Sequence, residues 1–153
     1  MIAKVIQIGN SKGIRIPNQI LKEMNIENQI VFKGWISGEK KDELFKSASI
    51  FCLPSYAEGF PMAVLDAWAY GLPVITTPVG GLPDVLINGE NALVFDAGDI
   101  STLSLLLEKL ISNDQLRNNL SEASLNLSKN EFSINLISKQ LDKLYSDLLQ
   151  KGC

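Results

Sequence analysis

The sequence contains no histidine among its 153 residues. Histidine is the most common general base near neutral pH and the most common metal ligand in proteins. Any acid–base chemistry must therefore use carboxylates or groups from another chain. No cluster of aspartate and cysteine stands in as a metal-binding pattern, so we expect neither a metal site nor a bound cofactor.

Cysteine, basic charge and long apolar runs are also scarce. Of the two cysteines, Cys52 lies in an apolar run and is expected to be a small buried hydrophobe, and Cys153 ends the chain. Two such residues build no disulfide framework, which favours a reducing, cytoplasmic setting. The net charge of −3 disfavours DNA as the main partner. No apolar run approaches the ~18 residues of a membrane span, so we expect at most a peripheral membrane contact.

From about residue 27 onward the sequence has the alternation of an α/β protein. Short β-branched runs predict four strands, at Gln29–Lys33, Ile50–Leu53, Pro73–Thr77 and Ala92–Phe95. Between them we predict a helix over Glu39–Ser47 and a second over Pro61–Tyr70, stopped by Gly71. Leu44 and Phe45 are expected on the buried side of the first helix. This order builds a parallel sheet.

The chain beyond Asp99 is predicted to be entirely helical. Two sets of apolar residues recur at helical spacing, and we interpret both as core contacts rather than partner-binding surfaces. The first set is Leu103, Leu106, Leu107 and Leu110, and the second is Ile134, Ile137, Leu141, Leu144 and Leu148.

The segment from Leu53 to Ile75 is the most informative part of the sequence. A strand ends at Leu53, a loop with one acid, Glu58, follows, and a helix begins near Pro61. The start of a helix carries free N–H groups and partial positive charge, so it can bind an anion such as phosphate. Glu58 could accept hydrogen bonds from sugar hydroxyls and Asp66 from a ribose. The alternative is a helix capped by Glu58 with Asp66 on its solvated face, and spacing alone leaves both interpretations open.

This stretch resembles the E-x7-E signature of a large family of retaining glycosyltransferases with the GT-B fold. Four neighbouring segments resemble the same family, in its order and at its spacing, so the resemblance covers residues ~25 to 150. They are Asn25–Ile36, Leu44–Ser55, Pro73–Asp84 and Gly89–Val94. The resemblance implies a Rossmann-like fold, an incomplete GT-B C-terminal domain that binds a nucleotide-sugar donor without a metal.

Carried over position by position, the resemblance gives each acid of the signature a role. Glu58 would contact the transferred sugar, and Asp66 would contact the ribose hydroxyls. Aspartate replaces the second glutamate of the family and is one methylene shorter. Gly34 and Ile36 would lie beside the base. The phosphates would be held by the backbone around Gly59, Phe60, Pro61, Met62 and Ala63. Trp68 is expected to pack the helix on the sheet rather than to bind a ligand.

The same resemblance implies parts that this sequence does not supply. Family members have two Rossmann-like domains with the active site between them, and the first has no counterpart here. The Arg and Lys that neutralise the donor diphosphate are also missing, although such electrostatic stabilisation is usually the largest catalytic contribution. We therefore expect weak binding of a donor such as a UDP- or GDP-sugar, and little turnover unless an N-terminal domain or partner chain completes the cleft.

The first 26 residues differ in character and are treated as a separate segment before the donor-binding domain at 27–153. Ile2–Ile8 and Gly13–Pro17 predict strands and Asn18–Met24 a short helix. The segment resembles the start of MazE/AbrB-type antitoxin domains, which implies that Lys4, Lys12 and Arg15 would face DNA. A solvated hairpin and a substitute βα unit of the transferase fold are the alternatives. A binding-only remnant and an antitoxin-like DNA-binding dimer remain rival functions.

Overall fold

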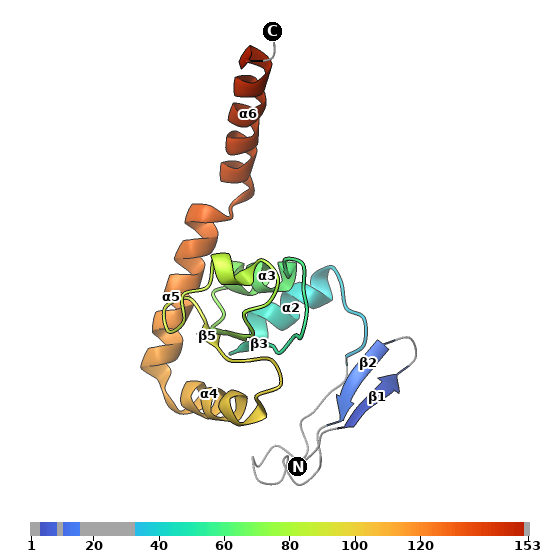
Figure 1. Ribbon diagram of the computed structural model, residues 1–153. Coiled ribbons are helices and arrows are strands. Elements are labelled where there is room, and N and C mark those ends of the chain that lie inside the picture. Colours follow the sequence, from blue (N-terminus) through green and yellow to red (C-terminus); the bar gives the residue numbers. More distant parts are fainter. Residues whose placement is uncertain (1–3, 9–10, 16–32, 152–153) are drawn as a thin grey trace. The chain divides into compact units, whose positions relative to one another are not determined.

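The computed structural model describes residues 4–8, 11–15 and 33–151 (Figure 1). The chain divides into two compact units, residues 1–37 and 38–153, which are treated separately below. The proposed boundary between residues 26 and 27 lies outside the described residues and stays a prediction.

The first unit contains a hairpin of two antiparallel strands. Strand β1 (Lys4–Ile8) pairs with β2 (Ser11–Arg15), in a register that runs from Lys4 opposite Arg15 to Ile8 opposite Ser11. The predicted pair of strands is confirmed, with β2 beginning two residues earlier than Gly13. The helix predicted at Asn18–Met24 lies outside the described residues, as does most of the strand predicted at Gln29–Lys33.

The second unit is built on a parallel sheet. Its strands β3 (Phe51–Leu53), β4 (Val74–Thr76) and β5 (Leu93–Val94) lie in the order β3-β4-β5. All three predicted strands are confirmed, each shorter by one or two residues. The central strand β4 is fully buried. The Rossmann-like α/β fold expected from the sequence is therefore present, with a parallel sheet and a helical last third.

Helices alternate with these strands in the order expected. Helix α2 (Glu39–Ser47) precedes β3, and α3 (Met62–Ala69) connects β3 to β4. A short 3-10 helix, η1 (Leu82–Asp84), follows β4. Gly71, with φ 67°, ends α3: its N–H donates to Trp68 and the N–H of Leu72 donates to Ala67, the arrangement of a Schellman motif.

Three helices form the last third of the chain: α4 (Ile100–Ser112), α5 (Asp114–Glu131) and α6 (Ile134–Lys151). Helix α4 begins at Asp99, whose carboxylate accepts hydrogen bonds from the N–H and hydroxyl of Thr102, and these bonds lower the pKa of Asp99 below its ordinary value. No helix in the described part of the chain is both long and apolar enough to cross a membrane.

The core has two parts, and successive residues of the central strand β4 belong to different parts, Val74 to the first and Ile75 to the second. One part surrounds Trp68 and includes Val64, Leu72, Val74 and Leu82. The other contains Ile75, Leu93, Phe95, Leu110 and Leu120, with Leu103, Leu106 and Leu107 packed against it. The apolar stripe predicted for α4 is therefore confirmed as core, and so is the packing role of Trp68.

Three burial predictions are wrong. The stripe on α6 does not face the core: Leu141, Leu144 and Leu148 are 45%, 52% and 57% exposed, because no element of the described residues covers this side of the helix. Leu44 is also exposed, and only Phe45 packs inward from α2. Cys52, in the edge strand β3, is exposed; partial burial of its thiol still raises the pKa to about 11.

Candidate functional site

The loop between β3 and α3, residues 54–61, holds Glu58 in a defined position. The hydroxyl of Ser55 donates a hydrogen bond of 2.7 Å to Oε1 of Glu58. The carbonyl of Ser55 in turn accepts a hydrogen bond of 2.5 Å from the Thr77 hydroxyl, which lies just past β4. Because the loop is thus connected to two neighbouring strands, the half-buried Glu58 carboxylate is fixed at the carboxyl edge of the sheet.

Two glycines after β4, Gly80 and Gly81, lie in close contact with the backbone of the same loop. The N–H of Gly81 donates a hydrogen bond of 2.7 Å to the carbonyl of Gly59. A Cβ on Gly80 would lie 2.2 Å from that carbonyl oxygen, and Gly80 has φ 63°. Sequence reasoning placed Gly80 and Gly81 in a family-like segment but gave them no role. The signal was present, since only glycine lets two backbones approach so closely.

The start of α3 is open to a ligand. Pro61 is buried at the N-cap position and supplies no side-chain cap to the helix. The first turn, with Met62 and Ala63, therefore offers its N–H groups and the positive end of the helix dipole. Gly59 has nothing within 4 Å of the place a Cβ would occupy. An anion could approach the backbone here without displacing a side chain.

Asp66 lies one turn further along α3 and is half-buried. Its Oδ2 lies 2.5 Å from the Nζ of Lys41 on α2. The Asp66 side chain is still 37% exposed, so the alternative that places it on the solvated face of α3 stays open, with Lys41 as its partner there. Sequence reasoning did not pick out Lys41, because only the fold brings α2 beside α3.

The aromatic ring of Phe60 connects the loop to the end of α5. Its ring lies 6.5 Å from the ring of Phe132, which is 6.0 Å from that of Trp68. Glu58, Gly59, Phe60, Pro61, Met62, Ala63 and Asp66 are thus brought together around one loop and one helix start. Gly34 and Ile36 belong to the first unit, where Gly34 has φ 67°.

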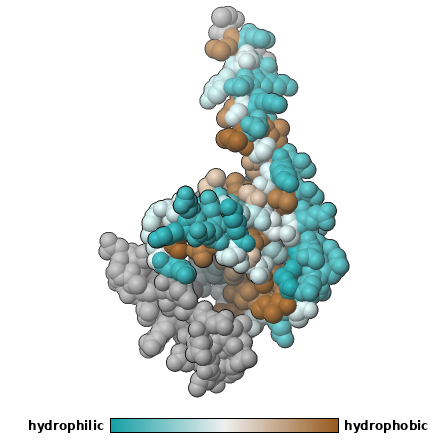
Figure 2. Space-filling model, turned by 180° about the vertical axis from the view of Figure 1, so that it is seen from behind, coloured by the Kyte–Doolittle hydropathy of each residue, from teal (hydrophilic) through white to brown (hydrophobic). Residues whose placement is uncertain are grey.

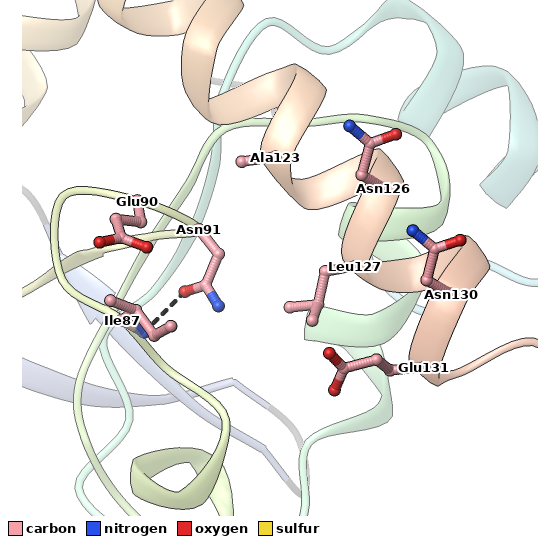
Figure 3. Close-up of a pocket in the computed structure, with 8 residues that line it drawn as sticks. All are labelled: Ile87, Glu90, Asn91, Ala123, Asn126, Leu127, Asn130 and Glu131. Atoms are coloured by element: carbon pink, nitrogen blue, oxygen red, sulfur yellow. Dashed lines mark hydrogen bonds between the residues drawn. The ribbon is translucent and has the colours of Figure 1, made fainter.

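A shallow pocket of the second unit lies elsewhere, between the loop at residues 87–91 and α5 (Figure 3). It is lined by none of the residues predicted as the site. Asn91 at its edge is occupied by structural hydrogen bonds, since its side chain accepts from the N–H of Ile87 and donates to the carbonyl of Val85. This pocket is therefore part of the packing between loop and helix and gives no second candidate site.

A parallel sheet with alternating helices, and a loop carrying an acid before an uncapped helix, define a Rossmann-like α/β protein. The family described as glycosyl transferases group 1 matches residues 4–126. This match spans β1 through most of α5 and includes the whole loop. The chain belongs to that family. Because the match begins at residue 4, it also takes in the segment that resembles an antitoxin, and that resemblance stays a prediction.

Curated relatives carry glycosyltransferase and synthase names. The chain is 31% identical to the capsular polysaccharide biosynthesis glycosyltransferase CapM of Staphylococcus aureus, over 71% of this chain and 28% of CapM. It is 27% identical to the N-acetyl-alpha-D-glucosaminyl L-malate synthase of Bacillus anthracis, over 97% of this chain and 38% of the synthase. The chain thus spans about a third of the length of the curated relatives it matches.

Solved structures share the fold. Sucrose-phosphate synthase from Thermosynechococcus elongatus superposes with a TM-score of 0.72 at 25% identity, over 88% of this chain and 34% of that one. Anabaena Alr3699/HepE, solved in complex with UDP, superposes with a TM-score of 0.74 at 20% identity, over 86% of this chain and 36% of that one. Both similarities confirm the Rossmann-like fold.

Proposed function

We propose that this chain binds the nucleotide-sugar donor of a retaining glycosyl transfer, at the loop before α3. Glu58 contacts the transferred sugar, the backbone from Gly59 to Ala63 binds the phosphates, and Asp66 binds the ribose. The roles of Gly34 and Ile36 beside the base stay predictions from the sequence, because both residues belong to the first unit. HepE, which shares the fold, was solved with UDP and with UDP-glucose, and this supports a nucleotide-sugar as the ligand.

The observation that carries the proposal is the open space at Gly59. The glycines at 80 and 81 are explained by close contacts within the protein, whereas Gly59 meets nothing within 4 Å and has an ordinary φ. The fold itself therefore does not require glycine at this position. A phosphate bound at the uncapped start of α3 would require it, since a side chain here would stand in the way of the ligand.

The chemistry assigned to this half of the enzyme is electrostatic. When a glycosyl group leaves a nucleotide diphosphate, negative charge builds up on the phosphate oxygens. The N–H groups and dipole at the start of α3 stabilise that charge, as preorganised donors do in other transferases. Glu58, held by Ser55, orients the sugar while the bond to the diphosphate breaks. Such a reaction, and the nucleotides that feed it, fit the cytoplasmic setting expected from the sequence.

The first prediction concerns the donor site itself. Titration calorimetry of the chain with UDP, GDP and their common sugars should show saturable binding that selects one nucleotide. Glu58→Gln and Asp66→Asn should each weaken donor binding about tenfold, because each removes a charged acceptor for hydroxyl groups. Gly59→Ala should weaken binding as strongly and leave the free energy of unfolding within about 0.5 kcal/mol of wild type.

Gly89→Ala is the matched control for that titration, since it adds the same methyl group in open space away from the loop. It should bind the nucleotide as wild type does. A folded wild-type chain that binds none of these nucleotides would overturn the proposal. So would a Gly59→Ala variant with undiminished affinity, because the open space would then have no ligand to accommodate.

Turnover requires a second half that binds the acceptor, which we propose to come from an N-terminal domain or a partner chain. The apolar stripe of α6 is its docking surface. Ile134, Leu144 and Leu148 are 76%, 52% and 57% exposed on one side of this helix, and hydrophobic residues are visible along it in Figure 2. Exposed apolar surface of this extent on a soluble protein marks an interaction site. A binding-only role is the second candidate, as the sequence alternatives already allowed.

The second prediction tests that stripe. The wild-type chain should self-associate in size-exclusion chromatography at tens of micromolar, because the uncovered stripe of one molecule can bind that of another. The variant Leu144→Glu/Leu148→Glu should elute as a monomer with unchanged far-UV circular dichroism, because both side chains are exposed on the helix surface. Identical elution of the two proteins would show that the stripe does not mediate self-association.

A further inference from the structure

Lys41 is joined to the proposed donor site by an ion pair between two separate helices. Its Nζ lies 2.5 Å from Oδ2 of Asp66, and the two side chains are 40% and 37% exposed. Within residues 33–151 the other ion pair, Arg117 with Asp114, lies inside a single helix. The pair with Lys41 therefore links Asp66, the residue proposed to bind the ribose, to helix α2.

Further contacts fix Lys41 and hold α2 against α3. The Lys41 Nζ lies 5.6 Å from the centroid of the Phe45 ring, one helical turn further along α2. The hydroxyl of Tyr70, at the end of α3, donates a hydrogen bond of 2.7 Å to Oδ1 of Asp42. The rings of Phe45 and Tyr70 lie 5.3 Å apart. These contacts keep α2 against the end of α3 and place the Lys41 ammonium group beside Asp66.

This contact changes what Asp66 can do. Lys41 contacts Oδ2, so Oδ1 remains as the acceptor for a ribose hydroxyl. The short aspartate side chain gains a fixed direction that a mobile exposed carboxylate would lack. The ammonium also offsets the negative charge of Asp66, which would otherwise repel an incoming diphosphate bound at the start of the same helix.

We propose that Lys41 is a positioning residue of the nucleotide site, which orients and neutralises Asp66 for a ribose and makes no contact of its own with the ligand. This inference rests on the proposed function, because it assigns a ribose to Asp66. It concerns specificity: Lys41 acts on the affinity for ribonucleotides through Asp66, so its effect disappears when Asp66 or the ribose hydroxyl is absent.

The test is a double-mutant cycle in the full chain. Lys41→Met, Asp66→Asn and the double variant are titrated by calorimetry with the nucleoside diphosphate that the wild type selects, and with its 2′,3′-dideoxy form, which lacks both ribose hydroxyls. Lys41→Met and Asp66→Asn should each weaken ribonucleotide binding about five- to tenfold, and the double variant should bind no more weakly than Asp66→Asn alone. With the 2′,3′-dideoxynucleotide the effect of Lys41→Met should fall below about twofold.

Two further variants separate positioning from bulk charge and from folding. Lys40→Met makes the same change of net charge on the same helix, at an exposed position that takes no part in the ion pair with Asp66, and should bind as wild type does. Lys41→Arg should retain most of the affinity, because it keeps a cation beside the carboxylate. Urea unfolding of Lys41→Met should shift by less than about 1 kcal/mol, as expected for an exposed ion pair.

Each other outcome overturns the inference. Additive effects of the two substitutions would show that Lys41 acts independently of Asp66. An equal loss with the 2′,3′-dideoxynucleotide would show that Lys41 does not act through the ribose hydroxyls, and tighter binding by Lys41→Met would show that the ion pair blocks the site. If Glu58→Gln weakens binding of the nucleotide-sugar while the Lys41 variants follow one of these patterns, the proposed function stands and only the inference about Lys41 fails. No nucleotide binding by the folded wild-type chain overturns both.

Discussion

Gly80→Ala should abolish nucleotide binding and destabilise the chain by about 3 kcal/mol. A Cβ at this position would lie 2.2 Å from the carbonyl oxygen of Gly59 and 2.5 Å from that of Glu58. These are backbone atoms of the proposed donor loop, so the loop itself has to move. Gly80 also has φ 63°, a conformation that alanine adopts only with strain. Urea unfolding and titration calorimetry measure the two effects.

Gly89→Ala is again the matched control, because Gly89 has φ 85° but open space around its missing Cβ. It should lose about 1 kcal/mol from backbone strain and keep its nucleotide affinity. The difference between the two variants then isolates the contact between the glycine pair and the loop. Equal stability losses, or normal binding by Gly80→Ala, would show that this contact does not hold the loop in place.

Trp68→Ala should destabilise the second unit by about 3–5 kcal/mol, which is the largest effect that we expect on stability. Trp68 belongs to α3, and its side chain is fully buried in the core. Its indole N–H donates a hydrogen bond of 3.1 Å to the carbonyl of Asn91, so alanine leaves a cavity and removes a buried donor. Circular dichroism during urea unfolding gives the free energy without relying on tryptophan fluorescence.

Two comparisons make the result for Trp68 specific. Tyr145→Ala removes an aromatic side chain that is 61% exposed on α6 and should change stability by less than about 0.5 kcal/mol. Trp68→Phe should cost less than Trp68→Ala, because the ring still fills the core and the Ser124 hydroxyl also donates to the carbonyl of Asn91. A loss below about 1 kcal/mol for Trp68→Ala would contradict the burial of this residue.

Residues that start or stop helices and strands could be recognised in the sequence, because they act on the backbone within a few residues. Gly71 predicted the end of α3, and the structure shows why: the residue has a positive φ that closes the last turn. The β-branched runs predicted β3, β4 and β5 for the same kind of reason. Burial was harder to predict. A helical stripe of leucines looks alike whether it packs on a core, as in α4, or stays exposed, as in α6.

The sequence by itself determined the parallel α/β order, the position of the acid-bearing loop before α3 and the family, because each depends on residues close together in the chain. Only the tertiary structure decided how that loop is held. The contacts of Gly80 and Gly81 with Gly59, of Thr77 with Ser55 and of Lys41 with Asp66 join residues about 20 or more positions apart. No local pattern specifies such contacts, since they arise when the chain folds and separate elements pack together.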